Sequence, residues 1–209
     1  MGIHTIYNGS FTSKDYKNMG SPKNLIIPYG YTSIGKHAFF IGYADSDDPN
    51  NDSFFPDFYN GCETLKSVKF PDTLTCIEEE AFCGCKNLHT INFSESIDTI
   101  EDGAFIACTS LQSLVLPKAL KAINRGTFFL CENLKSITLH NNIEIIDDIA
   151  FKKCSSLSSI NIPSSVIEIG RSAFSACALK TIETPNSVSS IGKAAFLSCK
   201  ELSSEPFLN

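Results

Sequence analysis

The sequence predicts an α/β-type solenoid that is mostly β, in which short parallel strands stack coil upon coil. Three observations predict it: a repeat of about 23 residues, a fixed set of apolar positions within it, and alternating apolar and polar residues near the start of each unit. The chain has 209 residues, of which 43% are hydrophobic and 19% are charged. It is therefore long enough for one elongated array with a continuous core, and it needs no cofactor to fold.

The repeat is visible in six units, which begin at Leu65, Leu88, Leu111, Leu134, Leu157 and Leu179. With each leucine as position 1, apolar residues recur at positions 1, 4, 6, 10, 13, 17, 18 and 21. Position 18 is phenylalanine in every unit: Phe82, Phe105, Phe128, Phe151, Phe174 and Phe196. A column of one residue type at a fixed period indicates that each coil stacks its phenylalanine on that of its neighbour.

Within a unit, positions 4 to 6 alternate apolar, polar, apolar, which is the period of a half-buried strand. Proline is frequent at position 7 and can end the strand, because it lacks the N–H that the ladder would use next. A second extended or 3₁₀ stretch is expected at positions 10 to 13, followed by a return through "AF". Successive coils should lie roughly 4.8 Å apart.

The unit LSSINIPSSVIEIGRSAFSAC from Leu157 resembles the BspA-like, Treponema pallidum-type family of leucine-rich repeat proteins. The resemblance covers residues 65–201 strongly and residues 22–64 in part. It implies a right-handed leucine-rich repeat superhelix with turn or 3₁₀ returns, whose strand-bearing surface is concave and commonly binds ligands. It further implies a protein-binding or adhesion module that is secreted or displayed at the cell surface.

The register divides the chain into four parts. Residues 1–21 are expected to form a degenerate capping coil, with Phe11 and Tyr16 at positions 13 and 18. Residues 22–64 form a first repeat with a 20-residue insertion at about 43–62, because the register breaks after Phe39 and resumes at Cys62 in position 21. Six repeats occupy residues 65–201. Residues 202–209 are either a C-terminal partial repeat, blunted by a charge and a proline, or the truncated end of a longer array.

Cysteine follows the repeat rather than a metal-binding spacing. Seven of the nine cysteines occupy position 21 and are predicted to be buried, reduced thiols. Cys83 and Cys85 form a C-x-C pair, but no second pair with matching spacing accompanies it, so no metal site is predicted.

The other signals exclude several function classes. No nucleophile-elbow, metalloprotease or phosphate-loop motif occurs, so the chain is not expected to be an enzyme. A net charge of −6 without a lysine or arginine cluster argues against nucleic acid. No apolar run is long enough to span a membrane. We expect a monomer whose partner is a protein, such as one on a host or cell surface.

The first candidate binding surface is the row of outward positions 3 and 5. Its residues are Ser67, Lys69, Thr90, Asn92, Ser113, Val115, Ser136, Thr138, Ser159, Asn161, Thr181 and Glu183. The row lacks tryptophan, tyrosine and arginine, the residues that usually dominate binding energy. It is either a partner-binding surface or a hydroxyl-rich ladder that solvates the sheet.

A second row lies at positions 14 and 15. Glycine at position 14 is followed by a cation, as in Gly170-Arg171, whereas an acid is followed by another acid, as in Glu78-Glu79. The glycines are predicted to adopt a positive φ in a turn. The acidic flank of the first two full coils is either a solvated face or a docking site for a basic partner or a cation.

The insertion supplies a third candidate surface, formed by Asp45, Asp47, Asp48, Phe54, Phe55 and Tyr59. Its aspartates do not fit an EF-hand loop, because Pro49, Asn50 and Pro56 occupy positions that need a ligand or a glycine. Some of its aromatic rings should pack on the neighbouring coil, and any left exposed would be binding anchors.

Three functions follow from these surfaces. A non-catalytic protein-binding or adhesion module is the leading hypothesis. An intracellular, cytoplasmic interaction scaffold is the alternative, favoured by nine apparently unbridged cysteines. A carbohydrate-binding domain that uses the aromatic residues of the insertion is the second alternative.

Overall fold

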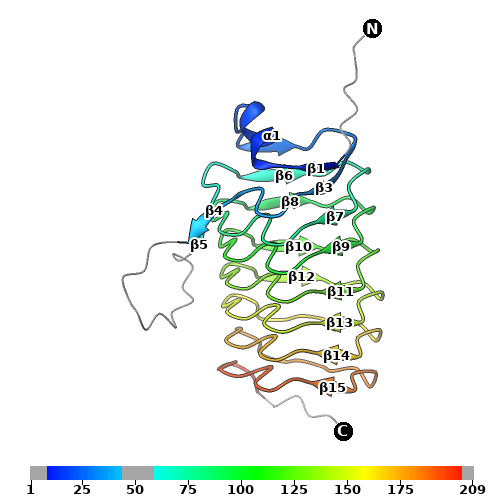
Figure 1. Ribbon diagram of the computed structural model, residues 1–209. Helices are drawn as coiled ribbons and strands as arrows, with labels where there is room; N and C mark the ends of the chain where they lie inside the picture. The colour runs from blue at the N-terminus through cyan, green and yellow to red at the C-terminus, as the bar shows by residue number, and fades with distance from the viewer. Residues whose placement is uncertain (1–8, 44–58, 204–209) are drawn as a thin grey trace.

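A computed structural model describes residues 9–43 and 59–203, and these residues form one β-solenoid (Figure 1). The predicted fold class is confirmed: short parallel strands stack coil upon coil. Apart from the six-residue helix α1 (Ser13–Asn18), the described residues contain no helix, and the returns are turns rather than 3₁₀ segments. Each coil is named here by the residue at its position 1, from Pro22 and Leu65 to Leu179.

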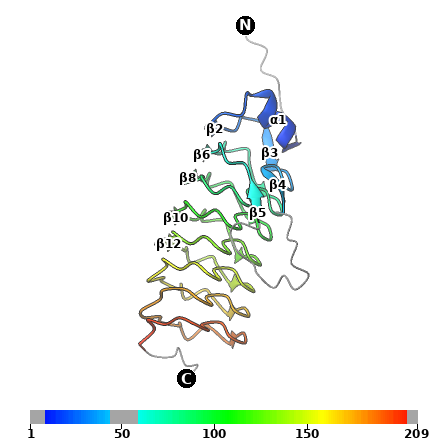
Figure 2. The ribbon, with the colours of Figure 1, turned by 90° about the vertical axis from the view of Figure 1, so that its left-hand side faces the viewer.

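One row of strands occupies positions 3 to 5 and is called the strand face (Figure 2). It consists of β2 (Asn24–Ile26), β6 (Ser67–Lys69), β8 (Thr90–Asn92), β10 (Ser113–Val115) and β12 (Ser136–Thr138). The strands pair in parallel as β2-β6-β8 and as β10-β12. The middle residue of each points inward, as with Val68 and Leu114, so the alternation seen in the sequence is the alternation of the pleat. The same stretch forms no strand in the Leu157 and Leu179 coils.

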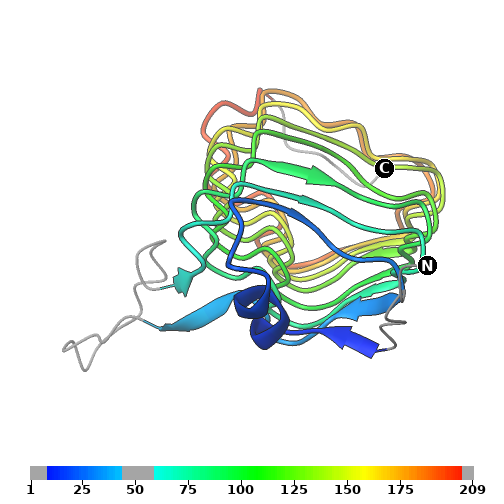
Figure 3. The same cartoon turned by 90° about the horizontal axis from the view of Figure 1, so that it is seen from above.

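A second row of strands lies on another side of each coil, at positions 12 and 13 in the full repeats (Figure 3). Its members are β1 (Gly9–Phe11), β3 (Tyr31–Ile34), β7 (Cys76–Ile77), β9 (Thr99–Ile100), β11 (Ala122–Ile123), β13 (Ile145–Ile146), β14 (Glu168–Ile169) and β15 (Ser190–Ile191). They form the sheets β1-β3-β7-β9 and β11-β13-β14-β15, both parallel. The predicted apolar position 13 lies in this row, and the isoleucines that occupy it point into the core.

The phenylalanine column runs through the core as predicted. From Phe39 to Phe196 successive ring centroids lie 4.7 to 5.7 Å apart and successive ring planes differ by 2 to 10°. Five of these rings, from Phe82 to Phe174, are completely buried. Each coil therefore covers the aromatic face of the next one, and the core is continuous along the stack.

The returns through positions 16 to 20 carry a third, continuous row of hydrogen bonds. In the Leu65 coil, the N–H groups of Glu80, Phe82 and Gly84 donate to carbonyls of the next coil at 3.0, 2.8 and 2.8 Å. Positions 16 and 20 have positive φ in every full coil, whether they hold glycine, as at Gly103 (63°), or another residue, as at Ser172 (53°). These two left-handed residues turn the chain twice within each return.

Glycine at position 14 has a different role from the one predicted. Gly35, Gly170 and Gly192 do not have positive φ. A Cβ added at Gly170 would lie 2.4 Å from the backbone nitrogen of Asp148, and one at Gly192 would lie 2.4 Å from that of Arg171. Gly170 and Gly192 are needed because the preceding coil approaches their backbone too closely for a side chain in that direction.

Position 21 is a ladder of thiols that are buried from Cys85 to Cys177 and half-buried at its two ends, Cys62 and Cys199. The Sγ atoms of Cys108, Cys131, Cys154, Cys177 and Cys199 donate to the phenylalanine carbonyl of the preceding coil at 3.1 to 3.3 Å. All nine cysteines are free. Cysteine suits the position because it is small, packs as an apolar group and still offers a weak donor to a buried carbonyl.

The N-terminal coil covers the first end of the aromatic column. β1 pairs with β3, and Phe11 is completely buried at the level of Ile34. Helix α1 begins at a capping box formed by Thr12 and Asp15, and it places Tyr16 edge-on to Phe39 at 5.0 Å. Tyr16 is 6% exposed, and the ring of Phe11 is stacked on Phe39 with the centroids 6.0 Å apart, so both rings cover the end of the column.

The insertion leaves the first repeat through an antiparallel pair, β4 (Phe40–Tyr43) and β5 (Tyr59–Gly61). Across the base of this pair, the N–H of Cys62 donates to the Phe39 carbonyl at 2.8 Å. The same bond joins Cys85 to Phe82 at 3.1 Å within an uninterrupted coil. The coil therefore continues at Cys62 as though the intervening residues were absent.

Candidate binding surface

The residues predicted at positions 3 and 5 lie on the strand face. Eleven of the twelve are exposed, whereas Ser67 is half-buried and its hydroxyl donates to Asn24 Oδ1 at 2.8 Å. Eight belong to strands β6, β8, β10 and β12. The other four, Ser159, Asn161, Thr181 and Glu183, are exposed on the two coils that form no strand here.

The strand face is hollowed between β8 and β10. A groove of about 500 Å³ lies there, and six of the predicted residues line it: Thr90, Asn92, Ser113, Val115, Ser136 and Thr138. His89 and Glu95 add polar groups, and Phe93 and Pro117 add apolar surface. Phe93 is half-buried and packs on Phe70 and Phe105, so its ring is held rigidly beside the groove. Val115, 61% exposed, is an apolar contact that is open to solvent.

Two further exposed apolar residues lie in the Pro22 coil and were missed by the sequence prediction. Ile26 is 66% exposed in β2, and Tyr29 is 76% exposed shortly after it. The signal for Ile26 is present in the sequence, because it holds the outward position 5 that is polar in most other coils. Tyr29 is an exposed amphipathic ring of the kind that dominates many interfaces.

The carboxylates in the row at positions 14 and 15 accept hydrogen bonds within the fold. Glu78 accepts from Ser33 Oγ at 2.7 Å, from Ser10 Oγ at 2.8 Å and from the Lys36 N–H at 2.9 Å. Burial opposes ionisation of Glu78, but these hydrogen bonds outweigh it and hold the pKa of Glu78 below its ordinary value. Glu101 likewise accepts from the N–H of Glu79 at 2.9 Å. Glu78 and Glu101, both at position 14, therefore bind the backbone of the preceding coil.

Basic partners neutralise part of the same row. Lys36 pairs with Glu79, and Arg171 pairs with Asp148 at 3.2 Å. Within residues 9–43 and 59–203, no group of three or more His, Cys, Asp or Glu side chains is arranged to hold a metal ion. Docking of a basic partner on this flank stays a prediction.

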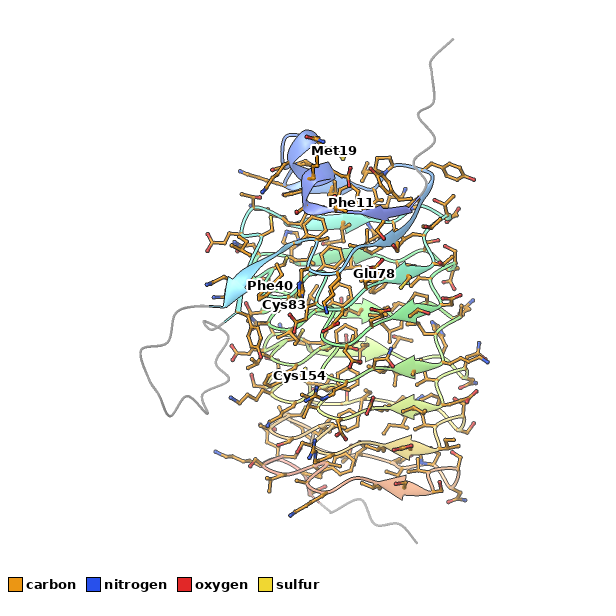
Figure 4. All side chains as sticks on the ribbon, in the orientation of Figure 1. Phe11, Met19, Phe40, Glu78, Cys83 and Cys154 are labelled. Atoms are coloured by element: carbon orange, nitrogen blue, oxygen red, sulfur yellow. The ribbon has the colours of Figure 1, made fainter. Side chains whose placement is uncertain are left out.

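At the base of the insertion, Phe40 packs on a small cluster that includes Cys83 (Figure 4), and a second groove of about 350 Å³ lies beside this base. Its apolar floor includes Ile106, Phe129 and Ile149, and charged side chains such as Asp102 and Arg125 stand at its rim. Burial, and then the nearby charge of Asp147, raise the pKa of Asp102. Beneath the groove, Cys83 is completely buried in the small cluster against which Phe40 packs.

Tyr59 was predicted to contribute to an exposed insert surface, and the structure corrects that prediction. It is 5% exposed and lies edge-on to Phe129 at 6.4 Å. β5 carries its ring onto the neighbouring coils, where apolar contacts remove it from solvent. The other members of that surface, Asp45, Asp47, Asp48, Phe54 and Phe55, lie outside the described residues.

No helix among the described residues is long and apolar enough to cross a membrane.

Comparison with known proteins adds to this geometry. A family model described as "BspA type Leucine rich repeat region" matches residues 55–151 and 123–208 in six copies. The crystal structure of a T. pallidum leucine-rich repeat protein matches with a TM-score of 0.72 and 22% identity, over 96% of this chain and 86% of that chain. A leucine rich cell surface protein from Faecalibacterium prausnitzii A2-165 matches with a TM-score of 0.53 and 24% identity, over 87% of this chain and 46% of that chain. Both structures share the fold. Comparison with curated proteins gives no match.

Proposed function

The chain belongs to the family of BspA type leucine-rich repeat proteins, and from that membership we propose that it is a non-catalytic adhesion module that binds protein partners through its strand face. Proteins of this family and fold are generally non-enzymatic and suited to protein interaction. The observation that carries the proposal is the groove between β8 and β10, because six predicted outward residues converge on it. It combines hydroxyl and amide groups with exposed apolar surface at Val115, as peptide-binding surfaces do.

The groove favours a peptide or protein ligand over a highly charged one. Most of its polar side chains are neutral, as with Thr90, Asn92 and Ser113, and Glu95 is the acidic residue of the lining. Neutral hydroxyls and amides can bond the main chain of a partner, while Val115 and Phe93 offer apolar contacts for its side chains.

A binding experiment with two matched variants tests this proposal. Peptides selected from a displayed random library on the wild-type chain should lose affinity at least about tenfold on Val115→Glu, because a carboxylate would enter the apolar part of the groove. Ile167→Glu is the control, since Ile167 is also an exposed β-branched residue, 46% exposed, but lies beside β14 in the other row. Equal loss in both variants, or no selected peptide, would contradict the proposal.

Carbohydrate is the competing ligand class. Hydroxyl-rich grooves also bind sugars, and aromatic residues such as those of the insertion are common in sugar-binding sites. A glycan array probed with the same wild-type chain separates the two classes. Saccharide binding that persists in Val115→Glu, together with failure of peptide selection, would favour the carbohydrate function.

The proposed place of action is outside the cell, either secreted or displayed at the surface. Support comes from family membership and from the likeness to a protein described as a leucine rich cell surface protein. An intracellular scaffold is the alternative, and its support is the nine free cysteines. Labelling of intact source cells with a membrane-impermeant amine reagent decides between them: an extracellular chain is labelled before lysis, whereas an intracellular one is labelled only afterwards.

A further inference from the structure

Neighbouring coils are joined by up to three rows of hydrogen bonds: the strand face, the second strand row and the returns. From the Leu65 to the Leu88 coil all three are present, since β6 pairs with β8 and β7 pairs with β9. All three are also present from the Leu111 to the Leu134 coil, through β10-β12 and β11-β13. Between the Leu88 and Leu111 coils neither strand row pairs, because β8 and β10 lie in separate sheets, as do β9 and β11.

Only at this step do both strand rows end among the described coils from Pro22 onward. The steps after the Leu134 coil lack strand pairing on the strand face alone, because β13, β14 and β15 still pair with one another. The aromatic column is also most widely spaced at this step, because the centroids of Phe105 and Phe128 are 5.7 Å apart, the largest separation between successive rings from Phe39 to Phe196.

The returns remain bonded at this step. The N–H groups of Gly103, Phe105 and Ala107 donate to the Leu111 coil at 2.9, 3.0 and 2.8 Å. The two coils are therefore held along one side by regular backbone bonds, and the two strand sides depend on side chains. An assembly bonded along one edge resists translation but bends about that edge.

Asn124 spans the second strand row at the break. Its Nδ2 donates to the Ile100 carbonyl at 2.6 Å. In other coils the equivalent carbonyl accepts a backbone N–H instead, as Ile77 does from Glu101 at 2.8 Å and Ile123 does from Asp147 at 2.9 Å. The side-chain amide thus bridges a gap that the backbone does not close.

We propose that the step between the Leu88 and Leu111 coils is a hinge between two rigid blocks, with its axis along the returns. The first block consists of residues 9–43 and 59–110, and the second of residues 111–203. The groove on the strand face has residues of both blocks in its wall, so bending at the hinge widens or narrows it. The hinge itself stands on the backbone pairing. Its use in fitting the groove to a partner rests on the proposed function.

Residual dipolar couplings of the ligand-free wild-type chain test the hinge directly. Backbone couplings from the two blocks should require alignment tensors of different magnitude, because two blocks that move relative to each other do not share one average orientation. A single tensor that fits both blocks within experimental error would overturn the proposal.

Amide exchange tests the same step at residue level. The N–H groups of Lys135 and Glu144 donate to Gln112 and Lys121 across a paired step. Gln112 and Lys121 hold the equivalent positions at the break and have no such bond within the described residues. Their amides should exchange at least about tenfold faster than those of Lys135 and Glu144. Equal protection at the two steps would contradict the break.

A pair of asparagine variants then links the break to bending. Asn124→Ala removes the bridging amide and should increase the difference between the two tensors. Asn142→Ala is the control, because Asn142 Nδ2 donates to the Lys118 carbonyl at 2.7 Å across a step whose strands are paired. Equal effects of both substitutions would show that Asn124 has no special place. Should Asn124→Ala fail to fold, the wild-type couplings still decide.

These measurements use no ligand, so they separate the hinge from the proposed function. If the chain bends but selects no peptide, the hinge proposal stands and the adhesion proposal fails. A chain that binds peptides in the groove but fits one tensor would keep the adhesion proposal and lose the hinge.

Discussion

Two backbone positions in each return are left-handed regardless of the residue they hold. Glu80, Leu130 and Ser172 have φ values of 52, 63 and 53°, a region that costs a residue with a Cβ about 1–2 kcal/mol. The turns keep this conformation because hydrogen bonds fix them from both sides. In the Leu65 coil, the N–H of Glu80 donates to the next coil and its carbonyl accepts from Cys83 at 3.1 Å.

Two substitutions in one coil should change stability in opposite directions. Ser172→Gly removes the cost of a left-handed Cβ, which raises the free energy of unfolding. The entropy that glycine adds to the unfolded state offsets part of this gain, so the net rise should be up to about 1 kcal/mol. Gly170→Ala places a Cβ 2.4 Å from a backbone nitrogen. Its free energy of unfolding should fall by about 1–3 kcal/mol or more. Urea denaturation followed by circular dichroism measures both, and effects of the same sign would contradict this account.

At the scale of the element, the coil is held by one aromatic ring and one thiol. Phe128 is completely buried between Phe105 and Phe151, with centroids at 5.7 and 5.5 Å. Cys154, from the following coil, donates to the Phe128 carbonyl at 3.2 Å. The ring supplies apolar burial, and the thiol binds a carbonyl that the core would otherwise desolvate.

Removal of the ring from one coil should destabilise the whole stack. Phe128→Ala leaves a cavity between two rings that are fixed by their own coils, so it should cost about 3–5 kcal/mol of unfolding free energy. Val115→Ala in the same Leu111 coil is the control and should cost no more than about 0.5 kcal/mol, because the side chain is 61% exposed. Similar costs in the two variants would mean that the repeat register is wrong.

At the scale of the whole molecule, the thiol ladder couples stability to alkaline pH. Burial raises the pKa of Cys108, Cys131, Cys154 and Cys177 well above the ordinary value. Burial, and then Glu101, raise the pKa of Cys76 to about 11. The folded state holds these protons more tightly than the unfolded state does, so the stabilisation is complete below the unfolded pKa, near 9.0, and is lost as pH rises.

Unfolding in urea at several pH values in the presence of reductant measures this coupling. Above about pH 9 each buried thiol should lower the free energy of unfolding by about 1.4 kcal/mol per pH unit, because the unfolded thiol ionises first. Cys131→Ala removes one such group and should reduce the slope by that amount. A slope that is unchanged in this variant would show that the ladder does not titrate on unfolding.

The sequence predicts what repeats. The phenylalanine column, the position-21 thiols and the outward residues of the strand face recur in register as predicted. The strand predicted at positions 4 to 6 lies at positions 3 to 5 and is absent from the Leu157 and Leu179 coils. The insertion was visible because the register stops after Phe39 and resumes at Cys62. The prediction of a positive φ for glycine at position 14 was wrong, because residue type alone does not distinguish a positive φ from a close approach of a neighbouring backbone. The prediction that Tyr59 is exposed was wrong, because the burial of a side chain depends on the tertiary surface against which it packs.

By itself, the sequence determines the fold of this protein, since one coil's apolar positions can be buried only by an identical coil above or below it. The tertiary structure decides how well each pair of coils is joined. The apolar pattern of the repeat does not predict the break between β8 and β10, because the Leu88 and Leu111 coils match their neighbours at every apolar position except 17, where Thr127 replaces alanine. Strand pairing depends on the distances between neighbouring backbones, and many side chains together set these distances. Both the groove and the proposed hinge lie at the step where the strands do not pair.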